Sequence, residues 1–149
     1  MAYRTVKQPG EAELVIKRSR FIGRCFPVAD EQEALRLLEQ VRRQHWDATH
    51  NCYAYSVGVS GACARYSDDG EPSGTAGLPM MEALRRSGVT DALVVVTRYF
   101  GGILLGLVCG WVYNRTCEKQ FKGIITQIYS GNRWSFTCMV VFSILFGFG

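Results

Sequence analysis

One apolar run limits the folds that this chain can adopt. Residues 91–100 read D-A-L-V-V-V-T-R-Y-F, so five apolar residues stand in a row before a polar end. A continuous run of this kind, in place of an alternating pattern, predicts a strand that is buried on both faces. The chain has 149 residues, enough for one domain with a real core and with no clear sign of a second.

Local signals predict further helices and strands around this run. The clearest helix begins at Asp30, a suitable N-cap, and Glu33 completes a capping box. A second helix ends before Gly88, the residue type that helices favour directly after their last turn. The expected elements are two strands within 13–28 joined near Ser19, a helix over 30–44, a strand over 51–58, a hairpin over 57–66 and a helix over 76–87.

Residues 65–77 form a polar loop between two of these elements. They read R-Y-S-D-D-G-E-P-S-G-T-A-G and combine carboxylates, hydroxyls and glycines with Pro72, which excludes a helix at its position. The loop leads into a predicted helix, for which Ser73 or Thr75 is the expected N-cap. Free backbone N–H groups at such a helix start form an anion site. The alternative is an ordinary surface turn before a capped helix.

The strand before this loop carries a histidine and a cysteine on one face. His50 and Cys52 are two residues apart, a spacing of about 7 Å at Cα. Three interpretations stay open: a thiol nucleophile with a histidine base, a metal site together with Asp68 or Asp69, or a polar residue at a strand end beside a buried cysteine. The distance suits neither close pairing nor a dedicated dyad.

A second group of candidates stands at the end of the apolar run. Arg98 and the Y-F-G-G segment that follows lie at or just past the carboxyl end of the predicted strand, where α/β sheets gather ligand sites. The Arg98 guanidinium can clamp a phosphate or a carboxylate through two hydrogen bonds. The alternative is a salt bridge to Asp68 or Asp69, and both interpretations can hold together.

Charge is distributed unevenly along the chain. The formal net charge is +4, but residues 1–105 hold 13 basic and 12 acidic residues. This near balance makes the overall basicity weak support for a nucleic-acid partner. In one interpretation the basic residues Lys17, Arg18 and Arg20 contact phosphate. In the other, which the sequence alone favours, they are solvated charges on an edge strand.

Cysteine usage and the first residues indicate a cytoplasmic protein without a membrane span. The six cysteines form no C-x-x-C pair and no zinc-finger spacing, so we expect free thiols in a reducing compartment. Residues 1–10 are polar and do not resemble a secretory signal. Residues 138–149 are apolar or small, but this segment is shorter than the roughly 20 residues that a spanning helix needs.

Three sequence blocks together resemble one protein family. They are H-N-C-Y-A-Y at 50–55, R-Y-S-D-D-G-E-P-S-G-T-A-G-L-P-M at 65–80 and V-V-V-T-R-Y-F-G-G-I-L-L-G at 94–106. With K-R-S-R-F-I-G at 17–23, they look like the N-terminal domain of the IMPACT/YigZ family. The resemblance covers about residues 10–106, and several ordered motifs at the family's spacing make it specific.

This resemblance implies both a fold and a function. The fold is of the α/β class, an α+β two-layer sandwich like the second domain of ribosomal protein S5, with helices on one face of a mixed sheet. The function is regulation of translation, with RNA, a nucleotide, the ribosome or a translation regulator as the partner. Bacterial members of the family are sometimes described as peptidases. This sequence contains neither the metal-ligand set nor the nucleophile constellation that such an activity requires.

The resemblance stops near Gly106. The family continues with a helix that reads like G-G-L-V-R-A-Y, whereas this chain reads L-V-C-G-W-V-Y-N-R-T-C-E-K-Q-F-K. We therefore expect the family domain over 1–106, a divergent tail without a recognisable domain over 107–149, and an altered or lost helix beside the Arg98 strand. One hypothesis is a frameshift or aberrant terminus that starts near Gly106. The alternative is a genuinely divergent tail that touches a membrane or forms a strand.

Three function classes follow, in this order. The first is a binding module for RNA, a nucleotide or a translation partner, with a cleft in which carboxylates hold Mg²⁺ against phosphate and an aromatic ring stacks on a base. The second is a protein-interaction module, and the third is a metal-assisted hydrolase. The residues expected to line the cleft are His50, Asn51, Ser67, Asp68, Asp69, Glu71, Ser73, Gly74, Thr75, Arg98, Tyr99, Gly101 and Gly102.

Overall fold

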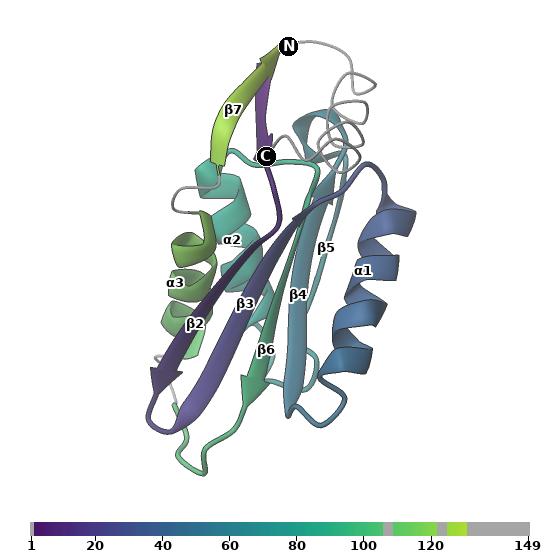
Figure 1. Cartoon of the computed structure of the whole chain (residues 1–149). Helices are drawn as coiled ribbons and strands as arrows, with labels where there is room; N and C mark the ends of the chain where they lie inside the picture. Colours follow the sequence, from purple (N-terminus) through teal and green to yellow (C-terminus); the bar gives the residue numbers. More distant parts are fainter. Residues whose placement is uncertain (1, 106–108, 122–124, 131–149) are drawn as a thin grey trace.

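The computed structural model describes residues 2–105, 109–121 and 125–130 of the chain. Its centre is a five-stranded sheet with the strand order β2-β3-β6-β4-β5 (Figure 1). The strands of this sheet are β2 (Gly10–Ile16), β3 (Ser19–Pro27), β6 (Ala92–Tyr99), β4 (His50–Val57) and β5 (Cys63–Ser67). A separate two-stranded sheet pairs β1 (Ala2–Val6) with β7 (Ile125–Ser130).

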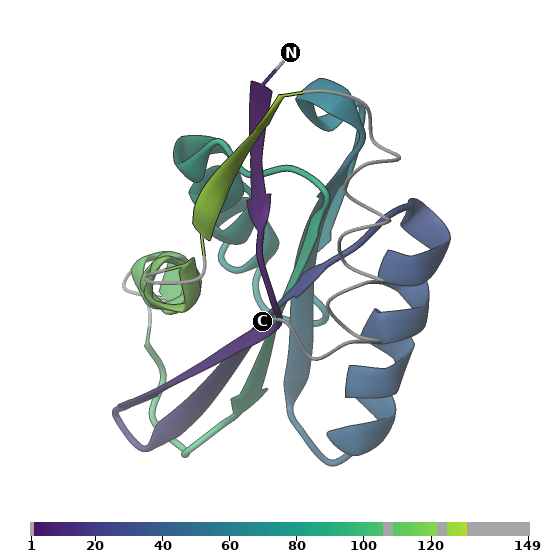
Figure 2. The same ribbon diagram turned by 45° about the horizontal axis from the view of Figure 1, so that its top comes forward.

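Helices cover both faces of the large sheet. Helix α1 (Glu31–Gln44) lies on one face, and α2 (Gly77–Ser87) and α3 (Cys109–Phe121) lie on the other (Figures 1 and 2). Strand β6 alternates between two cores: Leu93 and Val95 pack toward α1, and Val94 and Val96 pack toward α2 and α3. The expectation that the apolar run is a strand buried on both faces is confirmed.

The predicted start of α1 and the predicted end of α2 are also confirmed. Asp30 Oδ1 accepts a hydrogen bond from the Glu33 backbone N–H at 2.8 Å, and Glu33 Oε2 accepts one from the Ala29 N–H at 3.0 Å. The capping box therefore closes one residue earlier than its simplest form. Gly88 ends α2 in the left-handed region, with φ of 65°, and its N–H donates to a carbonyl of the last turn.

The sheet corrects two details of the expected architecture. The α+β class is confirmed, but every pairing in the five-stranded sheet is antiparallel, and the helices lie on both faces. Helix α1 connects two strands that run in the same direction, β3 and β4. These strands are not neighbours, because β6 lies between them and runs opposite to both. The sheet is therefore not mixed.

Helix α3 occupies the region where the sequence predicts an altered or lost helix. It begins at Cys109 and buries Val112, Tyr113 and Cys117 completely, against α2, β2 and β3. A helix thus forms although its sequence differs from the family pattern. The apolar segment at 138–149 lies outside the described residues. Within the described ranges, no helix combines the length and the apolar character that crossing a membrane requires.

Candidate functional site

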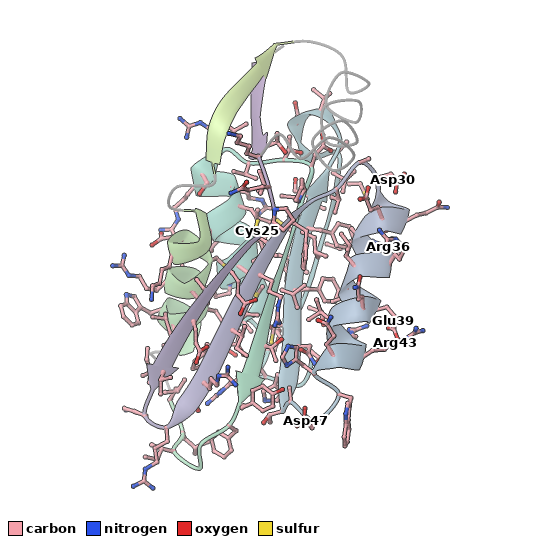
Figure 3. The ribbon with its side chains drawn as sticks, viewed as in Figure 1. Cys25, Asp30, Arg36, Glu39, Arg43 and Asp47 are labelled. Atoms are coloured by element: carbon pink, nitrogen blue, oxygen red, sulfur yellow. The ribbon has the colours of Figure 1, made fainter. Side chains whose placement is uncertain are left out.

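Four connecting segments meet at one end of the large sheet, which we call the loop end. They are the β2–β3 turn at 17–18, the α1–β4 loop at 45–49, the β5–α2 loop at 68–76 and the segment at 100–105 after β6. In Figure 3, Asp47 marks this end beside α1 and Asp30 marks the opposite end of that helix.

Close contacts hold three of these segments together. The Phe100 N–H donates to Thr49 Oγ1 at 3.0 Å, and the Gly101 N–H donates to Ser19 Oγ at 3.2 Å. Gly101 also packs directly on the β2–β3 turn: a Cβ added there would lie 2.1 Å from the Arg18 carbonyl oxygen. Only glycine fits this position, so the turn and the Phe100 segment form one surface.

The start of α2 is filled by a side chain of this chain. One carboxylate, that of Asp68, accepts three backbone hydrogen bonds: from Gly74 at 2.9 Å, from Ala76 at 3.1 Å and from Gly77 at 2.8 Å. These N–H groups carry the positive end of the helix dipole, so the carboxylate neutralises it. The anion site expected at this helix start exists, and Asp68 occupies it.

The expected N-cap residues have other roles. Helix α2 has Ala76 as its N-cap, without a side-chain cap, so the prediction that Ser73 or Thr75 caps this helix is wrong. Ser73 is exposed. The Thr75 hydroxyl donates to the Pro72 carbonyl at 2.5 Å, which closes a local turn. Asp68 replaces both candidates because its two oxygens reach several N–H groups at once.

Asp69 fastens the same loop to the start of β4. Its carboxylate accepts a hydrogen bond from the Asn51 N–H at 2.7 Å, and its carbonyl lies 2.8 Å from His50 Nδ1. The Asn51 side chain donates to the His45 carbonyl and accepts from the Thr97 hydroxyl. Asn51 is 7% exposed and joins the α1–β4 loop, β6 and the Asp69 loop through these hydrogen bonds. The His50 ring faces the Asp69 loop.

Arg98 is a buried residue with a partner that the sequence does not single out. Its side chain is 5% exposed and pairs with the Glu71 carboxylate, whose own exposure is 4%. The predicted partners, Asp68 and Asp69, are both committed elsewhere. The Tyr113 hydroxyl of α3 donates to Glu71 Oε1 at 2.8 Å. A buried guanidinium therefore has its counter-charge supplied within the protein.

Two aromatic rings enclose this guanidinium. Its carbon lies 5.2 Å from the centre of the Phe21 ring and 5.3 Å from that of Phe100. In the sheet, Arg98 stands opposite Phe21 on β3 and opposite His50 on β4. Phe100 covers the guanidinium on the side toward solvent and remains 43% exposed itself.

A hollow of about 500 Å³ opens beside Arg98 and Phe100. It lies within the size range of small-molecule sites. Its polar part is formed by His50, Glu71 and Arg98, and its rim includes Leu104, which is 82% exposed. The remaining lining residues are Thr49, Gly70, Pro72, Thr75, Phe100 and Leu105.

Other candidates do not line this hollow. Tyr99 lies on the opposite face of β6 from Arg98, where its hydroxyl contacts His45 Nδ1 at 2.7 Å and donates to Asp47 at 3.2 Å. Ser67 accepts a hydrogen bond from the Asp69 N–H. The cleft expected from the sequence therefore divides: His50, Glu71, Thr75 and Arg98 line the hollow, whereas Asn51, Ser67, Asp68, Asp69, Ser73, Gly74, Tyr99, Gly101 and Gly102 lie outside its lining.

The geometry bears on the chemical interpretations of His50 and Cys52. Burial raises the pKa of the Cys52 thiol far above its usual range, and this thiol donates to the Asp68 carbonyl at 3.0 Å. A protonated, buried thiol is a poor nucleophile. In the part of the chain that the structure describes, no group of three or more His, Cys, Asp or Glu is placed to hold a metal ion.

The basic residues at the β2–β3 turn differ in their surroundings. Arg20 is exposed and paired with Glu13 through hydrogen bonds of 2.8 and 3.2 Å, but it lies on β3, an inner strand, and not on the edge strand that the solvated-charge interpretation expects. Lys17 and Arg18 are exposed at the tip of the turn, with φ of 47° and 66°. They lie beside the Phe100 segment because of the Gly101 contact.

Sequence reasoning missed two residues of this site. Tyr113 belongs to the region taken as the divergent tail, yet its hydroxyl reaches Glu71. The spacing of Val112, Tyr113 and Cys117 places these residues on one apolar helix face, so the sequence pattern could have predicted that Tyr113 is buried. The second residue is Ser19, whose Oγ accepts a hydrogen bond from the Arg98 guanidinium at 3.3 Å. These residues lie on different strands, so no local sequence pattern predicts this contact.

Comparison with known proteins agrees with this picture. A family model described as the Impact N-terminal domain matches residues 17–121, well over half of the chain. The chain belongs to this family. The resemblance found in the sequence is therefore confirmed, and the match runs through α3, past the boundary expected at residue 106.

Members of the Impact N-terminal domain family resemble this chain over its larger part. The IMPACT family member YvyE of Bacillus subtilis is 52% identical over 105 residues, which cover 70% of this chain and 48% of that protein. YigZ of Escherichia coli is 46% identical over 93 residues, or 61% and 46% of the two chains. A crystal structure of a hypothetical protein has a TM-score of 0.79 at 36% identity and covers 87% of this chain and 64% of its own.

The chain spans about half the length of the curated relatives it matches. The division at residue 106 and the frameshift hypothesis stay predictions. Residues 106–108, where that change would begin, lie outside the described residues. Translating the coding DNA in its other two frames tests the hypothesis, which fails if neither frame restores a stretch like G-G-L-V-R-A-Y.

Proposed function

We propose that the loop end binds single-stranded RNA, and that this binding serves the control of translation that the family resemblance implies. One observation carries the proposal: the Gly101–Arg18 contact joins two exposed cations to an exposed aromatic ring. Lys17 and Arg18 stand at the turn, and Phe100 stands on the adjoining segment. Proteins that bind single-stranded nucleic acid typically use cations to contact the phosphates and aromatic rings to stack on the bases.

A second aromatic side chain supports this surface. Trp46 is 82% exposed in the α1–β4 loop, which is joined to the Phe100 segment through Thr49. Exposed aromatic rings on adjoining loops offer stacking places for successive bases. Arg98 and the start of α2 are not phosphate contacts in this proposal, because Glu71 and Asp68 already balance their charges. Mg²⁺ remains a hypothesis for the RNA-bound state, in which phosphate oxygens would supply ligands.

The first experiment measures the binding of a fluorescent single-stranded RNA by anisotropy over a range of salt concentrations. The variant Lys17→Gln/Arg18→Gln removes two charges at the turn, and Arg36→Gln/Arg85→Gln removes two on α1 and α2. We expect the turn variant to bind about tenfold more weakly, with a salt slope smaller by about 1.4, and the control to match the unaltered protein. Equal behaviour of the two variants, or binding without salt dependence, contradicts the proposal.

A protein partner is the second candidate function, favoured by the aliphatic side chains at the same end. Leu104 is 82% exposed and Ile103 is 41% exposed, and such groups typically bind protein surfaces. Retention of the chain on ribosomes or on a translation regulator after nuclease treatment, with loss of retention in Leu104→Asp, supports this candidate. Release by nuclease favours RNA.

A further inference from the structure

The hollow at the loop end contains two hydrogen-bond acceptors that face each other. His50 Nδ1 lies 2.8 Å from the Asp69 carbonyl oxygen. A carbonyl only accepts, so Nδ1 carries the proton, and in the neutral ring Nε2 is left as an acceptor. Nε2 lies 3.8 Å from Glu71 Oε2. This distance is too long for a hydrogen bond between the two side chains.

The carboxylate of Glu71 is satisfied on one side only. Its Oε1 atom accepts hydrogen bonds from Arg98 and from Tyr113. Its Oε2 atom accepts no hydrogen bond from a described residue, and it is not among the buried atoms that lack a partner, so it is open to the hollow that Glu71 lines. A carboxylate oxygen at such a wall can accept a hydrogen bond from a ligand. A group that donates to both this oxygen and His50 Nε2 fits the gap between them.

The walls around these acceptors are suited to a flat, partly apolar group. Pro72, Leu104 and Leu105 line the hollow together with Phe100. One side of the Phe100 ring covers Arg98, and its exposed part faces outward at the rim. An amino group attached to a planar ring matches this combination, because the amino group donates to both acceptors while the ring contacts the apolar walls.

We propose that the hollow holds one base of the bound RNA and selects a base with an exocyclic amino group. Adenine, cytosine and guanine carry such a group, which donates to His50 Nε2 and Glu71 Oε2. Uracil carries a carbonyl oxygen there, which the two acceptors repel. This inference rests on the proposed RNA binding and adds base selection to it.

The sharpest test changes the ligand and leaves the protein intact. Two RNA oligonucleotides of equal length are compared at one salt concentration: oligoadenylate, and the same chain with purine riboside, in which hydrogen replaces the amino group. We expect about tenfold weaker binding of the second, as the loss of hydrogen bonds to a charged acceptor implies. Oligouridylate should bind as weakly as the purine-riboside chain. Equal affinities for all three overturn the inference.

A protein variant then locates the preference. His50→Leu removes one acceptor, and we expect it to reduce the preference for adenine to less than about threefold without changing the affinity for oligouridylate. Full preference in a folded His50→Leu protein overturns the inference. The ¹⁵N spectrum of the unaltered protein gives an independent check, because a proton on His50 Nε2 at neutral pH removes the acceptor and excludes this site.

These outcomes separate the inference from the proposed function. If all sequences bind with the same affinity and with the salt dependence of the turn cations, base selection is excluded and RNA binding at the loop end stands. If no RNA binds at any salt concentration, the proposed function is wrong and the base site falls with it.

Discussion

The carboxylate of Asp68 accepts a hydrogen bond from the backbone N–H of Gly77, 2.8 Å away, at the first residue of α2. It binds the Gly74 and Ala76 N–H groups as well. The polar loop is therefore built around a charge that belongs to the protein, and its density of turn residues serves this arrangement. The stability of the protein therefore depends on this loop.

Asp68→Ala should destabilise the protein by about 2–4 kcal/mol, because several N–H groups lose a charged acceptor. Asp68→Asn should cost about 1–2 kcal/mol, since one oxygen remains. Urea unfolding measures both. Glu82→Gln, an exposed change on the same helix, is the control and should stay within about 0.5 kcal/mol of the unaltered protein. A cost for Asp68→Ala no larger than the control would show that the cap contributes nothing.

The buried pair of Glu71 and Arg98 should respond strongly to the loss of one partner. Glu71→Gln and Arg98→Met should each cost about 3–5 kcal/mol, because each leaves an uncompensated buried charge. The double variant should be more stable than the sum of the two costs predicts. A double-mutant cycle in urea measures this coupling. Simple additivity of the two changes would mean that the pair does not interact in solution.

Two glycines at the loop end should differ in their tolerance of alanine. Gly101→Ala forces a Cβ against the Arg18 carbonyl and should cost about 2–4 kcal/mol through displaced backbone. Gly74→Ala, with φ of 78° and open space around the new Cβ, should cost only about 1–2 kcal/mol of conformational strain. Thermal unfolding compares the two. If the order is reversed, the turn does not pack on the Phe100 segment.

Buried thiols predict lower stability in alkaline solution. Burial raises the pKa of Cys25 and Cys117 well above the usual thiol value. The folded state then keeps protons that the unfolded state releases above about pH 8.5, so stability is full below that pH and falls as pH rises. Urea midpoints at several pH values up to about 9.5 measure the slope. The variant Cys25→Ala/Cys117→Ala should be less stable than the unaltered protein at neutral pH, and its stability should fall less steeply as pH rises. If its stability falls with the same slope, groups other than these two thiols cause the pH dependence.

Helix α3 should be required for the fold, although the sequence places the domain boundary at residue 106. It covers the core next to β2, β3 and α2 with Val112, Tyr113 and Cys117. We expect a chain cut after residue 105 to lose its cooperative unfolding transition, and a chain cut after residue 121 to retain one. Circular dichroism during urea titration distinguishes them. A cooperative transition in the shorter chain would confirm the boundary at 106.

Elements with local causes were predictable from the sequence. The α1 start follows from Asp30 and Glu33, which are three residues apart, and the α2 end follows from Gly88 alone. The continuous apolar sequence of β6 predicts that this strand is buried on both faces. In each case the deciding contacts lie within one or two turns of the chain, so a single sequence contains the whole cause.

Contacts across the fold were not predictable in the same way. Arg98 had three carboxylates to choose from within four residues, and only the three-dimensional path of the loop selects Glu71. Asp68 reaches Gly77 across nine residues of irregular backbone. Tyr99 is different, since strand alternation alone puts it on the opposite face from Arg98. The alternation of side chains along a strand could therefore have excluded Tyr99 from the predicted cleft.

The position of β6 sets the order in which this sheet is completed. Strands β3 and β4 have no hydrogen bonds to each other, and both pair with a strand that is synthesised after them. On the ribosome, the β2–β3 and β4–β5 hairpins must wait, with their inner edges open, until residue 99 has left the exit tunnel. A pause in translation before that point prolongs the exposure of these edges, and the nascent chain is then most prone to aggregate.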